Sequence, residues 1–244
     1  MCDIYKNGDK GVEEKTLLEV IATSMEDVVQ ANRGGADRIE LCSNLNEGGL
    51  TPSDNFIKSA IEISDIPIQV MIRPHNRTFV FSESDLQEML RSILWAKKCG
   101  AAGVVVGALT HESRIDKQAL CTMMEAASRL NITFHRAFDY TRNLEEALDD
   151  LLDFPQINRL LTSGGASNAF EANDVIARMQ MRIQNTPIKL IAAAGLTADN
   201  IADFVERTKV TEVHMGRGVR IGMSIAHSID ADLVRLIKQL LKNL

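Results

Sequence analysis

The chain has 244 residues, of which 45% are hydrophobic and 25% are charged, and its formal net charge is −6. One domain accounts for this length, since α/β barrels commonly fill roughly 250 residues around a single core. The acidic balance excludes nucleic acid and anionic membrane surfaces as main partners, because both select concentrated positive charge. With a polar start and no run of the roughly 18 apolar residues that span a bilayer, the sequence predicts a cytoplasmic protein.

The pattern of the chain changes at residue 17. Residues 1–16 are polar and have no periodicity, so we expect a flexible N-terminal arm before a barrel over residues 17–244. Beyond that point, short β-branched apolar runs alternate with longer segments of helical period, which predicts strands of a parallel sheet joined by helices. The eight predicted strands are residues 17–21, 37–42, 68–72, 103–107, 132–135, 159–162, 189–193 and 211–214.

The intervening segments carry signals for helix starts. Short polar side chains at these positions can accept hydrogen bonds from the first amides of a helix. The last helix is predicted over residues 230–242. The predicted N-cap residues are Ser53, Ser82, Asp116, Asn143, Ser167 and Thr197.

Eight strand and helix units of about 28 residues each suit a closed, single-domain (β/α)8 TIM-type barrel with short loops. An open doubly wound sheet is the alternative. That fold would favour a Gly-rich turn directly after the first strand, where this chain has Ala22, Thr23 and Ser24.

Polar residues gather at the ends of the predicted strands. In a parallel barrel the chemistry lies at the carboxyl ends of the strands, so these residues are the candidates for a site. Glu40 and Cys42 stand two apart and therefore share one face of their strand. The other candidates are Glu19, Arg73, His75, His135, Arg136, Asp139, Ser163, Gly164, Gly165, Gly195 and His214.

The acidic and imidazole side chains of this set have three interpretations. They could form a structural salt-bridge network with the arginines, because an unpaired buried charge is strongly destabilising. They could instead supply general acid and base groups, or ligate a metal, although no H-x-H or H-E-x-x-H spacing supports a metal. The residues taken as catalytic candidates are Glu19, Glu40, His135 and Asp139.

The glycines after the sixth and seventh strands form a second group. Glycines at such positions let backbone amides converge on an anion, which predicts an anion-binding pocket for a phosphate or carboxylate. The alternative is that these glycines only make tight turns. The ligand-binding candidates are Arg73, His75, Arg136, Ser163, Gly164, Gly165, Gly195 and His214.

The four cysteines lie far apart without a C-x-x-C pair, which excludes a zinc knuckle and a thioredoxin-type redox site. We expect reduced thiols. Because free cysteine is among the most buried residue types, Cys99 and Cys121 are predicted to lie in the core.

Several motifs resemble the CutC copper homeostasis family. The similarity runs in the same order from about residue 17 to about residue 216. The segments that carry it are LEVIATSME (18–26), GGADRIELC (34–42), EGGLTPS (47–53), VMIRP (70–74), ITFHRAFD (132–139), RLLTSGG (159–165) and EVHMG (212–216).

The resemblance implies a cytoplasmic TIM-type barrel, often a homo-oligomer such as a dimer, that is linked to copper tolerance and binds copper as Cu(I). Soft sulfur ligands suit Cu(I), which makes Cys42 the candidate metal ligand, aided by Met71 or His75. Ile21 stands where the family commonly has a first cysteine. The alternative function is an enzyme that acts on a small phosphorylated or carboxylated metabolite by general acid and base chemistry.

Overall fold

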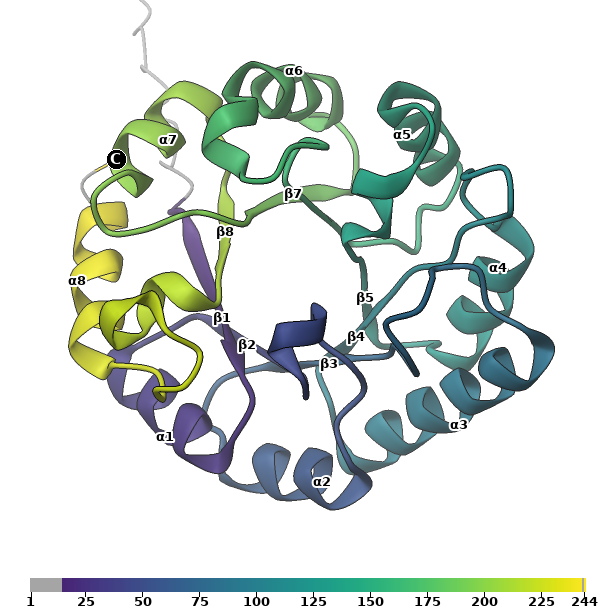
Figure 1. Cartoon of the computed structure of the whole chain (residues 1–244), viewed down its shortest axis with the longest axis horizontal. Helices are drawn as coiled ribbons and strands as arrows, with labels where there is room; N and C mark the ends of the chain where they lie inside the picture. Colours follow the sequence, from purple (N-terminus) through teal and green to yellow (C-terminus); the bar gives the residue numbers. More distant parts are fainter. Residues whose placement is uncertain (1–14, 243) are drawn as a thin grey trace, which may run out of the picture.

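The computed structural model describes residues 15–242 and 244 and forms one closed barrel of eight parallel strands, each paired with its neighbours in chain order. Eight helices surround the strands in a ring (Figure 1). The predicted (β/α)8 TIM-type barrel is therefore confirmed. Residues 1–14 of the predicted arm lie outside the described residues.

The predicted strands match the observed ones, with ends that differ by at most one residue. Short β-branched runs are enough to locate these strands because both of their faces are covered. The strands are β1 (Leu17–Ala22), β2 (Arg38–Leu41), β3 (Ile68–Met71), β4 (Gly103–Val106), β5 (Asn131–Phe134), β6 (Arg159–Thr162), β7 (Lys189–Ala193) and β8 (Glu212–Met215).

Four of the six predicted N-caps are confirmed. Ser53, Ser82, Asp116 and Asn143 each accept a hydrogen bond from an amide in the first turn of the helix that follows. The main helices are α1 (Met25–Gly34), α2 (Asp54–Ile63), α3 (Glu83–Cys99), α4 (Lys117–Ala126), α5 (Leu144–Leu152), α6 (Asn173–Ile183), α7 (Ile201–Thr208) and α8 (Ala231–Lys242).

The predicted caps at Ser167 and Thr197 are wrong. A short 3₁₀ helix, η3 (Ala169–Ala172), precedes α6, and its cap is Asn168 rather than Ser167. Before α7, the amide of Thr197 donates to the side chain of Asn200 at 2.8 Å, so the helix starts later than expected. Side chains that bond to their own neighbours compete with the helix in both places.

The strands separate two kinds of interior. Outward residues of the strands pack against the ring of helices in one large apolar core. Inside the barrel, Arg38 of β2 forms ion pairs with Glu19 of β1 and Glu212 of β8, and Arg159 of β6 pairs with Glu212 at 3.0 Å. A buried charge of this kind is stable only when it is paired, so these residues form one linked network.

The cysteines are only partly where the sequence predicted them. Cys99 is half-buried, whereas Cys121 is exposed because Ala119, Leu120 and Met123 occupy the buried face of α4. No disulfide joins the cysteines of the described residues. Within the same residues, no helix has the length and apolar character needed to cross a membrane.

Replacing Arg38 with alanine should lower the free energy of unfolding by about 3–5 kcal/mol, since the buried carboxylates of Glu19 and Glu212 each lose their ion pair with its guanidinium. Urea denaturation measures the loss. The control is Arg207→Ala, which removes an ion pair to Asp203 whose side chains are 61% and 46% exposed. That control should cost less than about 1 kcal/mol. Equal losses in the two variants would contradict the structural role of the buried network.

Candidate functional site

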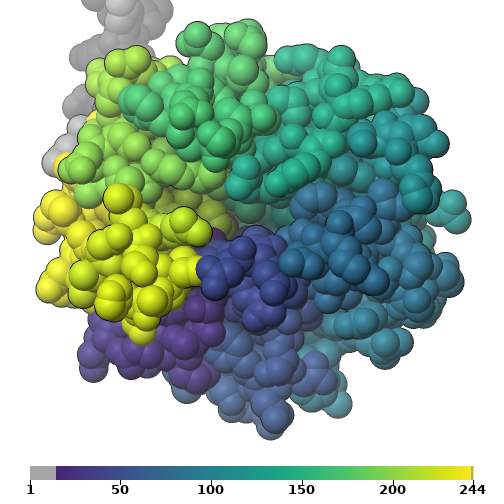
Figure 2. Space-filling model, in the orientation of Figure 1, coloured from purple at the N-terminus to yellow at the C-terminus, as the bar shows by residue number. Residues whose placement is uncertain are grey.

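A cavity of about 660 Å³ opens at the carboxyl ends of the strands. Figure 2 shows this face, where the dark-blue loop after β2 meets the yellow loop after β8 over the centre of the barrel and narrows its mouth. The volume suits a small metabolite. Six residues predicted for the site line the cavity, namely Glu40, Arg73, His135, Arg136, Gly195 and His214.

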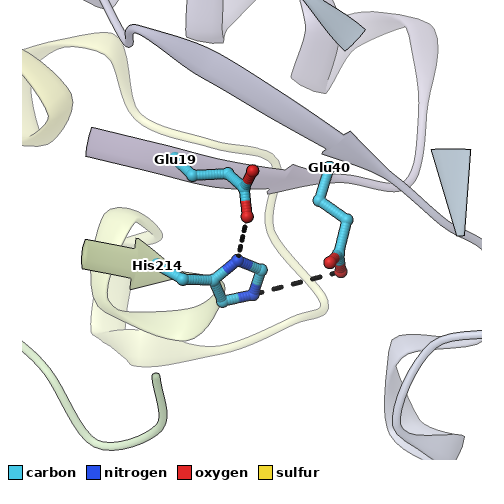
Figure 3. A group of neighbouring side chains, drawn as sticks. All are labelled: Glu19, Glu40 and His214. Atoms are coloured by element: carbon cyan, nitrogen blue, oxygen red, sulfur yellow. Dashed lines mark hydrogen bonds and ion pairs between the residues drawn. The ribbon is translucent and has the colours of Figure 1, made fainter. Parts of the chain in front are cut away.

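His214 of β8 lies between two carboxylates (Figure 3). Its Nδ1 is 2.7 Å from Oε1 of Glu19 on β1, and its Nε2 is 4.0 Å from Oε1 of Glu40 on β2. Glu40 and His214 line the cavity, whereas Glu19 lies behind them and is not among the lining residues. Glu19 therefore orients the ring, and its carboxylate pairs with Arg38 rather than with the arginines that the sequence suggested.

Burial and neighbouring charges shift the pKa values of Glu19, Glu40 and His214. Burial raises the pKa of Glu19, but the Arg38 guanidinium and the His214 hydrogen bond reverse this effect and bring the pKa to about 2. Burial raises the pKa of Glu40 to about 7, against the attraction of the His214 ring. Burial lowers the pKa of His214, yet the charges of Glu40 and Glu19 outweigh burial and raise it. With a pKa of about 7, Glu40 can take up and release a proton near neutral pH.

The same three residues form the candidate metal cluster of the described chain. Ligand atoms of Glu19, Glu40 and His214 lie within 4.8 Å of one another, and one oxygen of Glu40, Oε2, is buried without a hydrogen-bond partner. However, Arg38 already neutralises Glu19, and a guanidinium next to a carboxylate ligand repels a cation. The arrangement therefore favours proton transfer over metal ligation.

Arg73 follows β3 and is a buried cation that lines the cavity. Its Nη1 donates to the backbone oxygens of Glu47 at 3.2 Å and Gly49 at 3.5 Å, while its Nε has no hydrogen-bond partner. Its guanidinium lies 4.5 Å from the centre of the Phe79 ring. No ion pair to Arg73 is found in the part of the chain that the structure describes. Since burial lowers its pKa, the charge is costly without an anion.

His135 follows β5 on the cavity wall. Its Nδ1 accepts a hydrogen bond from the amide of Ala137 at 3.2 Å, and its Nε2 is buried without a partner among the described residues. Burial and the nearby Arg73 charge lower the pKa of His135 to about 3. The ring is therefore neutral at pH 7. A side chain at Gly107 would place its Cβ 2.5 Å from the imidazole, so glycine there makes room for the ring.

The loop after β6, which the sequence predicted to bind an anion, binds the carboxylate of Asp139 instead. The carboxylate of Asp139 accepts from the amides of Ser163 at 3.0 Å and Gly165 at 3.2 Å, and from Nε of Arg136 at 2.8 Å. None of Ser163, Gly164 and Gly165 lines the cavity, and neither does Asp139. These residues hold Arg136 at the rim, because its Nη2 also donates to the Ser163 hydroxyl at 2.8 Å.

His75 and Cys42 lie apart from the polar groups of the cavity. The His75 ring packs on Phe81 at 5.3 Å and faces Asp85, with 3.4 Å between Nε2 and Oδ2. Cys42 is fully buried in an apolar cluster with Met71, and burial together with the Glu40 charge raises the pKa of its thiol well above the ordinary value. The structure thus gives Cys42 a methionine neighbour rather than an imidazole.

Sequence reasoning missed Phe79 and Gly107. Phe79 lines the cavity and contacts Arg73, His135 and Tyr140 through its ring. Its position in the long loop between β3 and α3 was the available signal, because loops at the carboxyl ends of barrel strands form the site. The role of Gly107 depends on a contact between two strands and leaves no local signal.

The sequence is similar to one protein family along most of its length. The profile of the CutC family matches residues 16–219. A family protein CutC of Pasteurella multocida is 41% identical over 212 residues, which cover 86% of each chain. A human protein named copper homeostasis protein cutC homolog is 39% identical over 208 residues, which cover 85% of this chain and 76% of the human one.

Solved structures resemble the barrel at two levels. The crystal structure of CutC from Streptococcus agalactiae has a TM-score of 0.76 at 30% identity and covers 82% of this chain and 98% of its own. Phosphoribosyl anthranilate isomerase from Thermococcus kodakaraensis has a TM-score of 0.62 at 17% identity, covering 94% and 100%. The second likeness concerns the fold alone.

The pKa values of the two cavity histidines should be shifted in opposite directions from the ordinary value, upward for His214 and downward for His135. In ¹H–¹³C NMR spectra the His214 ring should titrate above 6.5, and the His135 ring should stay neutral down to about pH 3. A raised pKa stabilises the folded protein fully below pH 6.5, and this contribution is lost as the pH rises through the raised value. Glu40→Gln should lower the His214 midpoint, while the exposed Glu47→Gln should leave it in place. A His214 midpoint below 6.5 in the wild type would contradict the electrostatics of the cluster.

Proposed function

The chain belongs to the CutC family, and we propose that it is an enzyme that binds a small anionic metabolite in the barrel cavity and acts on it by general acid and base chemistry. The metabolite carries a phosphate or carboxylate group. The proposal includes a cytosolic location and a homo-oligomeric state, as the family resemblance implies.

The observation that carries this proposal is Arg73. It is a buried cation with 7% exposure and lines the cavity. Among the described residues, its side chain donates hydrogen bonds only to the backbone oxygens of Glu47 and Gly49. A buried charge without a counter-ion is strongly unfavourable, and an anionic ligand would supply the missing charge. The unpartnered Nε also gives the ligand a fixed donor.

The acid and base groups lie in the same cavity. Glu40 presents an unpartnered oxygen, and His214 stands beside it with its ring held by Glu19. A carboxyl group whose protonation changes near neutral pH, next to an oriented imidazole, suits proton transfer to and from a bound ligand. Glu40 is therefore the proposed proton carrier, and Glu19 is a positioning residue.

The rim of the cavity carries two arginines, and two of its loops approach each other closely. Arg136 and the exposed Arg217 both line the mouth. Gly195 has a φ of +75°, and a side chain there would meet Asn168 at 2.5 Å, so only glycine lets these two loops approach each other at the cavity wall. Positive charge at the mouth of a cavity attracts anions from solution.

A second candidate function is Cu(I) binding in copper homeostasis, the role in the name of the human relative. The observation in its favour is that Cys42 and Met71 pack in one buried cluster beneath Gly49, where a Cβ atom would meet Sγ of Cys42 at 3.4 Å and Cε of Met71 at 3.7 Å. Two soft sulfur donors fit Cu(I). The raised pKa of the Cys42 thiol opposes this role, because metal binding would have to displace its proton.

Anionic metabolites should raise the melting temperature of the protein, since a ligand that binds only the folded state stabilises it by mass action. Inorganic phosphate, sugar phosphates and small carboxylates form the panel for a thermal-shift measurement. Arg73→Met should abolish the shifts. Arg77→Met, which changes a nearby side chain that is 72% exposed, should preserve them. A panel without any shift, or an unchanged response of Arg73→Met, would sink the proposal.

Copper binding has its own test. If Cys42 and Met71 hold Cu(I), Cys42→Ser should remove one equivalent of binding in a competition titration with a Cu(I) chelator. Cys121→Ser changes an exposed thiol and should leave the high-affinity stoichiometry as it is. The same stoichiometry in the wild type and in Cys42→Ser would eliminate this candidate.

A further inference from the structure

The hydrogen bonds of His135 fix which of its nitrogens carries the proton. The amide of Ala137 donates to Nδ1 at 3.2 Å, so Nδ1 must offer its lone pair. A neutral imidazole then carries its single proton on Nε2. That nitrogen is buried, has no partner among the described residues, and belongs to a side chain with 3% exposure on the cavity wall. The cavity wall therefore carries a fixed, neutral N–H donor that has no acceptor in the part of the chain that the structure describes.

Two further contacts hold this donor in place. The absence of a side chain at Gly107 leaves room for the ring, because a Cβ would lie 2.5 Å from its Nδ1 and Cε1. On another side the Phe79 ring packs at a centroid distance of 5.2 Å. Phe79 also carries the Arg73 guanidinium at 4.5 Å, so the N–H donor and the unpaired cation flank one aromatic side chain.

A neutral N–H donor and a cation bind different groups of a ligand. Arg73 favours a full negative charge, whereas a neutral N–H polarises a carbonyl oxygen and binds more strongly as that oxygen becomes negative. A ligand that satisfies both groups has a carbonyl next to an anionic group. Glu40 lines the same cavity, and its Oε2 is buried without a hydrogen-bond partner among the described residues.

We infer that the cavity takes a 2-oxo acid or a similar carbonyl compound with an adjacent anionic group, and that His135 donates its Nε2–H to the carbonyl oxygen during enolisation. This inference rests on the proposed function, because it uses Arg73 as the anion site and Glu40 as the proton carrier. It adds the substrate class and the role of His135, which the general proposal leaves open.

The step balances within the cavity and needs no co-reactant. The Glu40 carboxylate takes a proton from the carbon next to the carbonyl, and the electron pair of that C–H bond becomes the C=C bond of an enolate. The carbonyl π electrons move onto its oxygen, which accepts the hydrogen bond from His135. Return of a proton from Glu40 to the same carbon restores the carbonyl compound. The same enzyme group thus exchanges the substrate proton with solvent.

The first test measures the tautomer of His135 in the unliganded wild-type protein. Long-range ¹H–¹⁵N NMR at pH 7 should show a protonated Nε2 and an unprotonated Nδ1 for this ring. His111→Phe removes an exposed histidine and helps assign the signals. An imidazolium, or a ring protonated on Nδ1, would overturn the inference without any reference to a ligand.

The second test follows exchange of substrate protons in D₂O by ¹H NMR, with pyruvate, 2-oxobutyrate and 2-oxoglutarate as probes. The wild type should accelerate the loss of protons next to the carbonyl. Glu40→Gln should return the rate to that of the buffer, and His135→Phe should lower it by about 10²- to 10³-fold, the usual cost of losing one oxyanion donor. His135→Gln keeps an N–H donor and should retain more activity than His135→Phe, while His111→Phe should match the wild type.

The outcomes separate this inference from the proposed function. Probes that raise the melting temperature through Arg73 but show no exchange would overturn the enolisation and leave the anion site standing. Phosphate and sugar phosphates that bind while all three oxo acids fail to bind would overturn the substrate class alone. If no anion of either panel binds, the proposed function itself fails. Equal exchange rates in His135→Phe and the wild type would remove His135 from the chemistry.

Discussion

The cost of burying a charge without a partner governs the interior of this barrel. Arg38 meets that cost by pairing with Glu19 and Glu212, which links β1, β2 and β8. Nearer the mouth, Arg73 donates hydrogen bonds to backbone oxygens and lies against the Phe79 ring, and no carboxylate of the described residues pairs with it. The two arginines therefore differ: the first closes an ion-pair network within the protein, and the second is the one that we propose binds an anionic ligand.

The ion pair between Arg38 and Glu19 also orients His214 at the cavity wall. Because Arg38 keeps Glu19 ionised, the Glu19 carboxylate can bind Nδ1 of His214. This contact directs Nε2 of the ring toward Glu40. The proposed proton carrier at the cavity wall, Glu40, thus depends on an arginine that does not line the cavity. A similar relation links Asp139 to Arg136, since the carboxylate gathers the loop after β6 and fixes the guanidinium at the rim.

The sequence was enough to predict the barrel and the strand ends, because each strand is a short apolar run with both faces covered. It also indicated Glu40, Arg73, His135 and His214 as candidates, since these polar side chains stand at strand ends where apolar ones are expected, and all four line the cavity. Pairing could not be predicted in the same way. That Arg38 is the partner of Glu19, and that Asp139 fills the amides of Ser163 and Gly165, depends on contacts between strands far apart in the sequence.

Arg73 is the cation that we propose binds an anionic ligand. A crystal structure of the protein soaked with oxalate, a planar dianion that resembles the enolate of a 2-oxo acid, tests this proposal most directly. The account predicts one oxalate in the barrel, with a carboxylate oxygen within hydrogen-bond distance of Nε of Arg73 and another oxygen facing Nε2 of His135. Oxalate bound only on the outer surface, or Nε of Arg73 paired with a carboxylate of the protein itself, would contradict it.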